Sequence, residues 1–246
     1  MKKLLSVLLT LVMLVPAFGS FPVIASAENY VAQVVDSNGN ATNYTTFEAA
    51  WKEAVNYGKT FKLLSNWMVS GGDFGANERN KATFFNGGAL SVPPSYSVTI
   101  DLNGHKICRD KGVNNMTDDG SVIRLFDGAS ITINDTSESK NGSIERGSSN
   151  YGGGIYAPSN NTVTMNGGRI RLCNGYYGGG VYSQKVPIYL AGNVQVYGNY
   201  SQGDLRQPCD VNFGDSFVRI AAFLAHNICE NNITVGELSD EVERNV

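Results

Sequence analysis

Carboxylates and cations in the middle of the chain are the residues that could carry out acid–base chemistry. Cleavage of a polysaccharide by a lyase needs a base such as Arg or Lys, beside carboxylates that hold calcium against an acidic sugar. A glycosidase needs two carboxylates about 5 to 10 Å apart. The acidic candidates are Asp101, Asp118, Asp119, Asp127 and Asp135, and the basic candidates are Lys106, Arg109, Arg124 and Arg146.

This set is not arranged like a dense calcium site. Asp118 and Asp119 are the only adjacent acidic pair among the candidates. Asp127 precedes a glycine and Asp135 lies between Asn134 and Thr136, and aspartate favours such positions because it bonds the backbone of turns. An enzymatic role is therefore kept as the alternative interpretation.

Nucleophilic and cofactor chemistry have weaker support. The histidines are His105 and His226, and the sequence contains no G-x-S-x-G motif, phosphate loop or dinucleotide fingerprint. No C-x-x-C pair is present, which argues against zinc, and we expect no cofactor. Disulfides would be possible if the protein is secreted, because they persist in oxidising compartments. Cys173, however, follows an apparent strand and is expected to be a small buried hydrophobic residue. The cysteines are Cys108, Cys173, Cys209 and Cys229.

Tyrosines at repeated positions are the better candidates for binding. Tyr156 and Tyr182 occupy equivalent places in two copies of a repeated unit, so they should stack. A row of exposed tyrosines suits sugar rings or a protein partner, and outward arginines could meet carboxylates or sulfates. The alternative is that the tyrosines only stabilise the stack and the arginines only keep the surface soluble. The binding candidates are Tyr156, Tyr182, Tyr176, Tyr177, Arg169 and Arg171, with Tyr151, Tyr189, Tyr197 and Tyr200 nearby in the sequence.

The repeated unit must position these side chains. One copy opens with GGGIY at Gly152 and the other with GGGVY at Gly178, and later parts match as Val163 with Ile188 and Asn174 with Asn199. Apolar and polar residues alternate between glycine turns, which predicts half-buried strands. Ile170 and Leu172 should point inward, and Arg169 and Arg171 outward. Each copy needs a neighbour to bury its apolar face, so the copies should stack about 4.8 Å apart.

The chain also resembles a known family. The segments GGGIYAPSNNTVTMNGGRI (152–170), GGGVY (178–182), VTIDLNGHKI (98–107) and ITINDTSESKNGSI (131–144) are similar to repeats of secreted right-handed parallel β-helix proteins of Gram-positive gut bacteria, with the pectin-lyase-like fold. The resemblance implies an all-β right-handed parallel β-helix solenoid with a small N-terminal α/β cap. It is a poor guide to function, because this fold carries lyases, glycosidases and non-enzymatic surface proteins.

Residues 28–66 are expected to form the cap, as a strand, a helix and a strand. Val31–Val35 is rich in β-branched residues. Thr45 and Glu48 fit a capping box with Thr45 as the N-cap. The helix would cover the end of the stacked strands, which makes Trp51 a core residue rather than a sugar-stacking one. Apolar residues recur with helical spacing at Phe47, Ala50, Trp51, Ala54 and Val55, and Gly58 should end the helix.

The remaining segments are assigned from composition. Residues 1–27 combine Lys2 and Lys3 with an apolar run and a small-residue site, which is typical of a secretory signal peptide. The resemblance implies that residues 67–236 form the parallel β-helix. Phe217–Leu224 fits a helix by the spacing of its apolar residues and a strand by alternation, and the resemblance favours the strand. Residues 237–246 read as an acidic tail.

Charge and motifs together favour an extracellular binding role. The 19 Lys and Arg against 22 Asp and Glu, a net charge of −3, argue against a nucleic-acid partner. We expect a secreted or cell-surface, non-enzymatic protein that binds a glycan or protein, with no stable membrane span after signal removal. The alternative is a polysaccharide lyase or glycosidase. A groove lined with Asp and Arg would favour the enzyme, whereas a flat side bearing Tyr, Thr and Asn would favour binding.

Overall fold

A computed structural model describes the side chains of residues 29–69, 90–109, 120–158, 160–183 and 188–201, and the backbone alone of the strands at 204–208, 211–212, 218–220 and 224–225. Within this part the chain is predominantly β, with a single helix and four sheets. Several expectations fall outside it, namely the signal peptide 1–27, most of the segment after Val69, the tail 237–246, Asp118, Asp119, Cys209, Cys229 and His226.

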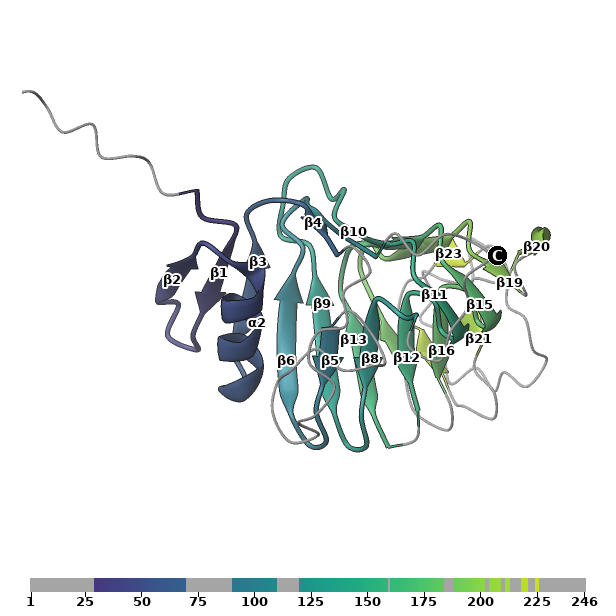
Figure 1. The fold of residues 1–246 in the computed structure, drawn as a ribbon, viewed down its shortest axis with the longest axis horizontal. Helices are drawn as coiled ribbons and strands as arrows, with labels where there is room; N and C mark the ends of the chain where they lie inside the picture. Colours follow the sequence, from purple (N-terminus) through teal and green to yellow (C-terminus); the bar gives the residue numbers. More distant parts are fainter. Residues whose placement is uncertain are drawn as a thin grey trace, which may run out of the picture.

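Sheet A is the largest sheet and has eight strands in the order β2-β1-β3-β6-β9-β13-β17-β22 (Figure 1). The first two pairings, β1 with β2 and β1 with β3, are antiparallel, and all later ones are parallel. The strands are β1 (Ala32–Val35), β2 (Ala41–Tyr44), β3 (Thr60–Leu63), β6 (Ser97–Asp101), β9 (Ser130–Asn134), β13 (Thr162–Met165), β17 (Ile188–Leu190) and β22 (Val218–Ile220).

Three smaller sheets carry the other strands. Sheet B comprises β4 (Trp67–Met68), β7 (Lys106–Cys108), β10 (Ser143–Glu145), β14 (Arg169–Arg171), β18 (Gln195–Tyr197) and β23 (Leu224–Ala225). Sheet C comprises β5 (Leu90–Val92), β8 (Ile123–Leu125), β12 (Ile155–Ala157), β16 (Val181–Ser183) and β21 (Val211–Asn212). Sheet D comprises β11 (Ser148–Tyr151), β15 (Asn174–Tyr177), β19 (Tyr200–Ser201) and β20 (Asp204–Pro208).

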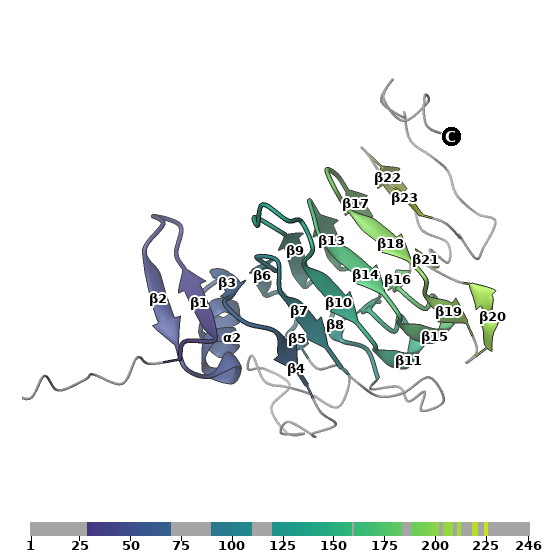
Figure 2. The ribbon, with the colours of Figure 1, turned by 90° about the horizontal axis from the view of Figure 1, so that it is seen from above.

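The chain visits these sheets in a repeating order. From β9 to β19 it passes from sheet A to B, then D, then C, and back to A, so that each pass lies beside the previous one (Figure 2). Neighbouring strands of successive passes are parallel. This arrangement is compatible with a β-helix-like fold. Within 217–224, the described residues Val218–Ile220 of β22 and Leu224 of β23 lie in strands, as the resemblance implied.

The register confirms most of the repeat and corrects one position. Ile155 pairs with Val181 and Val163 with Ile188, as predicted. Asn174, however, pairs with Tyr200 and not with Asn199. The amide of Asn199 lies in the corner before this strand, where its Oδ1 accepts the N–H of Cys173 at 3.0 Å.

Leu172 also departs from its predicted inward position. Its φ is +57° and its exposed fraction is 41%. Arg146 and Gly198 occupy the matching corners with φ of +59° and +64°. This left-handed residue breaks the alternation of the strand, so Cys173 takes the buried place, as a free thiol. Burial raises the pKa of Cys173 to about 12, which keeps the thiol protonated.

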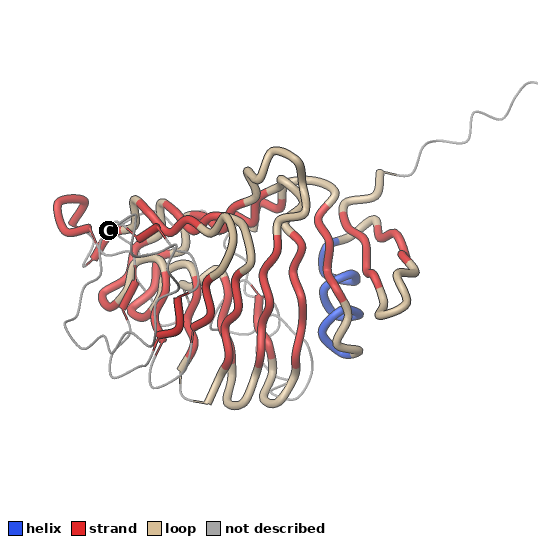
Figure 3. Tube along the Cα trace, turned by 180° about the vertical axis from the view of Figure 1, so that it is seen from behind, coloured by secondary structure: helices blue, strands red, loops and turns tan. Residues whose placement is uncertain are grey.

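The cap contains the predicted helix α2 (Phe47–Asn56), which lies at the end of sheet A (Figure 3). Trp51 is fully buried, and Phe47 stacks on Trp67 with ring centroids 4.7 Å apart. The N-cap is Thr46 and not the predicted Thr45, since the Thr46 hydroxyl accepts the N–H of Ala49 at 3.4 Å. None of the described helices is long and apolar enough to cross a membrane.

Two further details of the cap follow from local sequence. Gly58 ends the helix as predicted, because φ of +61° lets its N–H reach Val55 O at 3.4 Å while Lys59 N–H reaches Ala54 O at 2.8 Å. The predicted strand-helix-strand order missed β2. Residues 41–43 are all exposed, so that strand shows no alternation of apolar and polar residues.

Candidate functional site

Five tyrosines gather where sheets D and C meet, and we call them the tyrosine cluster: Tyr151, Tyr156, Tyr176, Tyr177 and Tyr182. Tyr151 pairs with Tyr177 across adjacent strands, and their rings stack at 5.4 Å with an interplanar angle of 15°. Tyr156 pairs with Tyr182 in the register of sheet C, and their ring centroids lie 5.7 Å apart with an interplanar angle of 50°. Tyr151 also stacks on Tyr156 at 5.4 Å, which joins the two sheets. The predicted neighbours Tyr156 and Tyr182 are therefore in contact, but their rings are tilted rather than stacked, and the stacked pairs are Tyr151 with Tyr177 and Tyr151 with Tyr156.

The triple-glycine corners allow these rings to meet. Gly152 and Gly178 have φ of +54° and +63° and turn the chain between the two sheets. The corners also stack closely, because a Cβ on Gly154 would lie 2.5 Å from the carbonyl oxygen of Gly180. Only glycine fits this approach, so the same residues that close the corner bring Tyr151 and Tyr156 face to face.

The cluster offers an exposed edge and an ordered base. Tyr176 and Tyr177 are 44% and 40% exposed, whereas Tyr182 is 9% exposed. Tyr176 packs edge-on against Tyr177 at 4.8 Å. Rings held in this way present an amphipathic surface with little rotamer freedom left to lose on binding.

Arg124 borders the cluster, a position that the sequence did not reveal. It pairs with Tyr156 in the register of β8 and β12. Its guanidinium carbon lies 5.0 Å from the ring centroids of both Tyr156 and Phe126. From its sequence alone, Arg124 is a candidate base. Cation–π contacts with two rings make it part of the aromatic surface instead.

The two predicted arginines lie elsewhere, on sheet B, and differ from each other. Arg171 donates from Nε and Nη2 to Oε1 of Glu145, at 2.9 and 2.7 Å. Burial alone would raise the pKa of Glu145, but hydrogen bonds from Ser143 and Arg171 outweigh it and lower that pKa. Arg171 is thus committed within the protein. Arg169 is half-buried, and its Nε is buried with no hydrogen-bond partner in the described part of the chain.

Sheet A presents a second surface, rich in hydroxyl and amide groups. Thr99, Thr132 and Thr164 face outward in register on successive strands. Tyr189 continues the row on β17 and is 38% exposed. In the neighbouring row, Asn166 Nδ2 donates to Asn134 Oδ1 at 2.9 Å. This row of Thr and Tyr beside Asn is the kind of side that the sequence analysis associated with binding.

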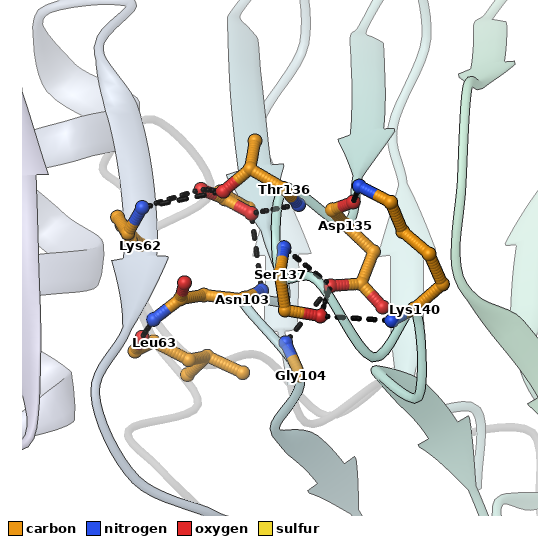
Figure 4. A network of polar contacts seen from close by, with 9 residues as sticks. Lys62, Leu63, Asn103, Gly104, Asp135, Thr136, Ser137 and Lys140 are labelled. Carbon is orange, nitrogen blue, oxygen red and sulfur yellow. Dashed lines mark hydrogen bonds and ion pairs between the residues drawn. The ribbon is translucent and has the colours of Figure 1, made fainter.

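Asp101, an acidic candidate, is the last residue of β6, and its carboxylate belongs to a polar network with Lys62, Asn103 and Thr136. Figure 4 shows these three partners. Its Oδ1 accepts the N–H groups of Asn103 and Thr136, each at 3.0 Å. Its Oδ2 accepts the Thr136 hydroxyl at 2.7 Å and lies 3.1 Å from Lys62 Nζ. These contacts bury a carboxylate that lies on the outward side of β6, where it holds two turns together.

Asp135 does the same for the next loop (Figure 4). Its oxygens accept the N–H groups of Gly104 at 2.8 Å, Ser137 at 3.2 Å and Gly142 at 2.6 Å. The turn role predicted for Asp135 is confirmed. Each carboxylate binds backbone amides of its own turn and of the neighbouring turn, an arrangement that stabilises turns and leaves few lone pairs for a ligand.

The other acid–base candidates are dispersed. Arg109 donates to Ser121 O at 2.6 Å, and Asp127 accepts from Asn160 at 2.8 Å. Lys106 Nζ lies 3.9 Å from Glu145 Oε2. Among the residues whose positions are described, no group of three or more His, Cys, Asp or Glu could hold a metal ion.

Comparison with known proteins gives no family for this chain. No protein-family model, no curated protein and no solved structure matches it.

Proposed function

We propose that the chain is a secreted or cell-surface right-handed parallel β-helix of the pectin-lyase-like kind, which binds an extracellular glycan without cleaving it. The observation that carries the proposal is the tyrosine cluster, where Tyr176 and Tyr177 expose their rings while Tyr151 holds them by stacking. Sugar rings have apolar faces that pack on aromatic rings, and their hydroxyls can bond the phenol groups at the edge.

Preorganisation supports recognition at this cluster. Each tyrosine ring has only two side-chain torsions, and stacking already restricts them in the free protein. A ligand would therefore meet an ordered surface, and little ordering entropy would oppose binding. The threonine and asparagine rows of sheet A would extend the contact along a fibre or a long chain.

The occupied carboxylates favour binding over cleavage. A lyase or glycosidase needs carboxylates free to exchange protons or to hold calcium. Asp101 and Asp135 instead accept hydrogen bonds from backbone amides of their own and of the neighbouring turn. We therefore propose a module that holds its ligand and performs no chemistry on it.

The test compares two tyrosine variants. Tyr176→Ala combined with Tyr177→Ala removes the exposed edge of the cluster, and Tyr57→Ala removes a tyrosine on the cap that is 68% exposed. Glycans found on an array are then titrated by calorimetry. We expect the double variant to bind about tenfold more weakly, because each ring contact is worth about 0.5–1.5 kcal/mol, and the Tyr57 variant to bind normally.

Two outcomes would contradict the proposal. Release of unsaturated uronides or reducing ends by the wild-type protein would make it an enzyme. Absence of wild-type binding to every glycan, or equal loss of affinity in the cap variant, would reject glycan recognition by the tyrosine cluster.

A further inference from the structure

Arg169 is an unusual cation on the outward face of sheet B. Its side chain is half-buried between those of neighbouring strands, and its Nε is shielded from solvent without a hydrogen-bond partner in the described residues. Leaving a buried donor unsatisfied costs about 1–3 kcal/mol, and more when the group is charged. Such a group is usually explained by water, an ion or a ligand. Arg171, two positions further along the same strand, is instead saturated by Glu145.

Lys106 lies on β7, and Arg169 lies on β14, on the other side of the strand β10. Both Lys106 and Arg169 pair with Ser143, on the two strands that flank β10 (Figure 2). Their Cα atoms are thus two strand spacings apart, roughly 10 Å. Two long cationic side chains at that distance can converge on one small anion above Ser143.

The charges of this face leave room for an anion. On the described strands of sheet B, Lys106, Arg169 and Arg171 face a single carboxylate, Glu145. Arg171 and the Ser143 hydroxyl both donate to Oε1 of that carboxylate, the hydroxyl at 2.7 Å. Lys106 Nζ lies 3.9 Å from the other oxygen, Oε2. Ser143, Arg171 and Lys106 thus share the one carboxylate, and the three cations of this face exceed its single negative charge on a chain whose net charge is −3.

The geometry points to an anion site between Lys106 and Arg169 that takes a carboxylate or sulfate group of an acidic polysaccharide. This inference goes beyond the proposed function, since it adds a second surface and a charged ligand class to the aromatic contact. Arginine suits such groups because its planar donors match two acceptor oxygens. Sheet B and sheet D follow each other along the chain at Leu172, so one long chain molecule can cross from Arg169 toward Tyr176.

The experiment measures binding of the full chain to three polymers. Dextran sulfate tests sulfate, polygalacturonate tests carboxylate, and neutral dextran is the uncharged reference. Arg169→Gln and Lys106→Gln each remove one cation of the site. Lys52→Gln removes an exposed cation of helix α2 and is the matched control.

We expect wild-type protein to bind at least one of the two anionic polymers, more weakly as salt increases, and not to bind dextran through this site. Arg169→Gln should weaken binding about tenfold or more, in line with a charge-assisted hydrogen bond. Lys106→Gln should weaken it about threefold, because its ammonium is more exposed. Lys52→Gln should leave it unchanged.

Folding is checked by thermal unfolding of each variant. Arg169→Gln removes an unsatisfied donor, so its melting temperature should equal or exceed that of the wild type. The anionic polymer should raise the melting temperature of the wild type and not that of the variant. This second readout separates loss of the site from loss of structure.

The inference is overturned if Arg169→Gln binds like Lys52→Gln, or if wild-type protein binds neither anionic polymer. The experiment distinguishes failure of this anion site from failure of glycan binding at the tyrosine cluster. Polyanion binding that survives Tyr176→Ala with Tyr177→Ala but fails in Arg169→Gln supports this site even where the aromatic proposal is rejected. Loss in the tyrosine variants alone rejects the site at Arg169.

Discussion

Asp135 shows how one carboxylate can organise a loop. Burial alone would raise its pKa, but hydrogen bonds from Ser137, Gly142 and Gly104 outweigh that effect and lower the pKa. A lowered pKa in the folded state means that the charged form stabilises the fold. This stabilisation is complete above the pKa of the unfolded chain and is lost as pH falls through the folded pKa.

Asp135→Asn should test this role. The amide keeps the size of the side chain but offers an N–H group where Gly142 N–H needs an acceptor. We expect a loss of about 2 kcal/mol in the free energy of unfolding near neutral pH, measured with urea. The difference from wild type should shrink in acid, where the wild-type carboxylate is protonated.

Asp127→Asn is the control for that change. Asp127 is exposed and accepts one hydrogen bond, from the side chain of Asn160. Its replacement should change stability by less than about 0.5 kcal/mol. Equal losses in the two variants, or a loss at Asp135 that does not depend on pH, would contradict the role assigned to the charge.

At the scale of elements, the start of helix α2 allows the capping roles of two adjacent threonines, Thr45 and Thr46, to be compared. The structure places the N-cap at Thr46, whereas the sequence pattern placed it at Thr45. Thr46→Ala should lower the free energy of unfolding by about 1 kcal/mol, because the N–H of Ala49 loses its acceptor. Thr45→Ala should have little effect. If urea denaturation shows a larger loss of stability for Thr45→Ala than for Thr46→Ala, Thr45 is the N-cap after all.

The strands of the repeats were predictable from sequence, and the corner at Leu172 was not. The alternation of apolar and polar residues identified Val163 and Ile188 as inward residues. A strand that is buried on one side has an apolar residue at every second position. The period fails at Leu172, whose left-handed backbone rotates the next residue inward. Nothing local marks that conformation in a leucine, since only glycine and asparagine commonly adopt it.

The candidate site was also predictable only in part. Equivalent places in the two repeats were enough to bring Tyr156 beside Tyr182. The pairing of Arg171 with Glu145 depends on the register between different passes of the chain, which a single pattern does not fix. Arg124 was likewise separated in sequence from Tyr156, the tyrosine of the cluster that it contacts.

At the scale of the molecule, the buried side chains form one continuous core that runs from Ala32 in the cap to Val196 in sheet B. A continuous core predicts that the described part unfolds in one cooperative transition. Trp51 and Trp67 lie in the cap and at the start of sheet B, so their fluorescence reports on one end. Fluorescence and far-UV circular dichroism should give coincident urea curves, whereas an earlier fluorescence transition would show that the cap melts separately.

The glycine corners of the repeats have a consequence for how such a chain can evolve. Because Gly154 lies on Gly180 and Ile155 on Val181 with matching register, a gene duplication that copied one pass would add a layer that fits its neighbours on both sides. Copies could then diverge in their outward residues without disturbing the interior. Lineages could in this way lengthen the molecule and change its outward surface by recombination, one layer at a time.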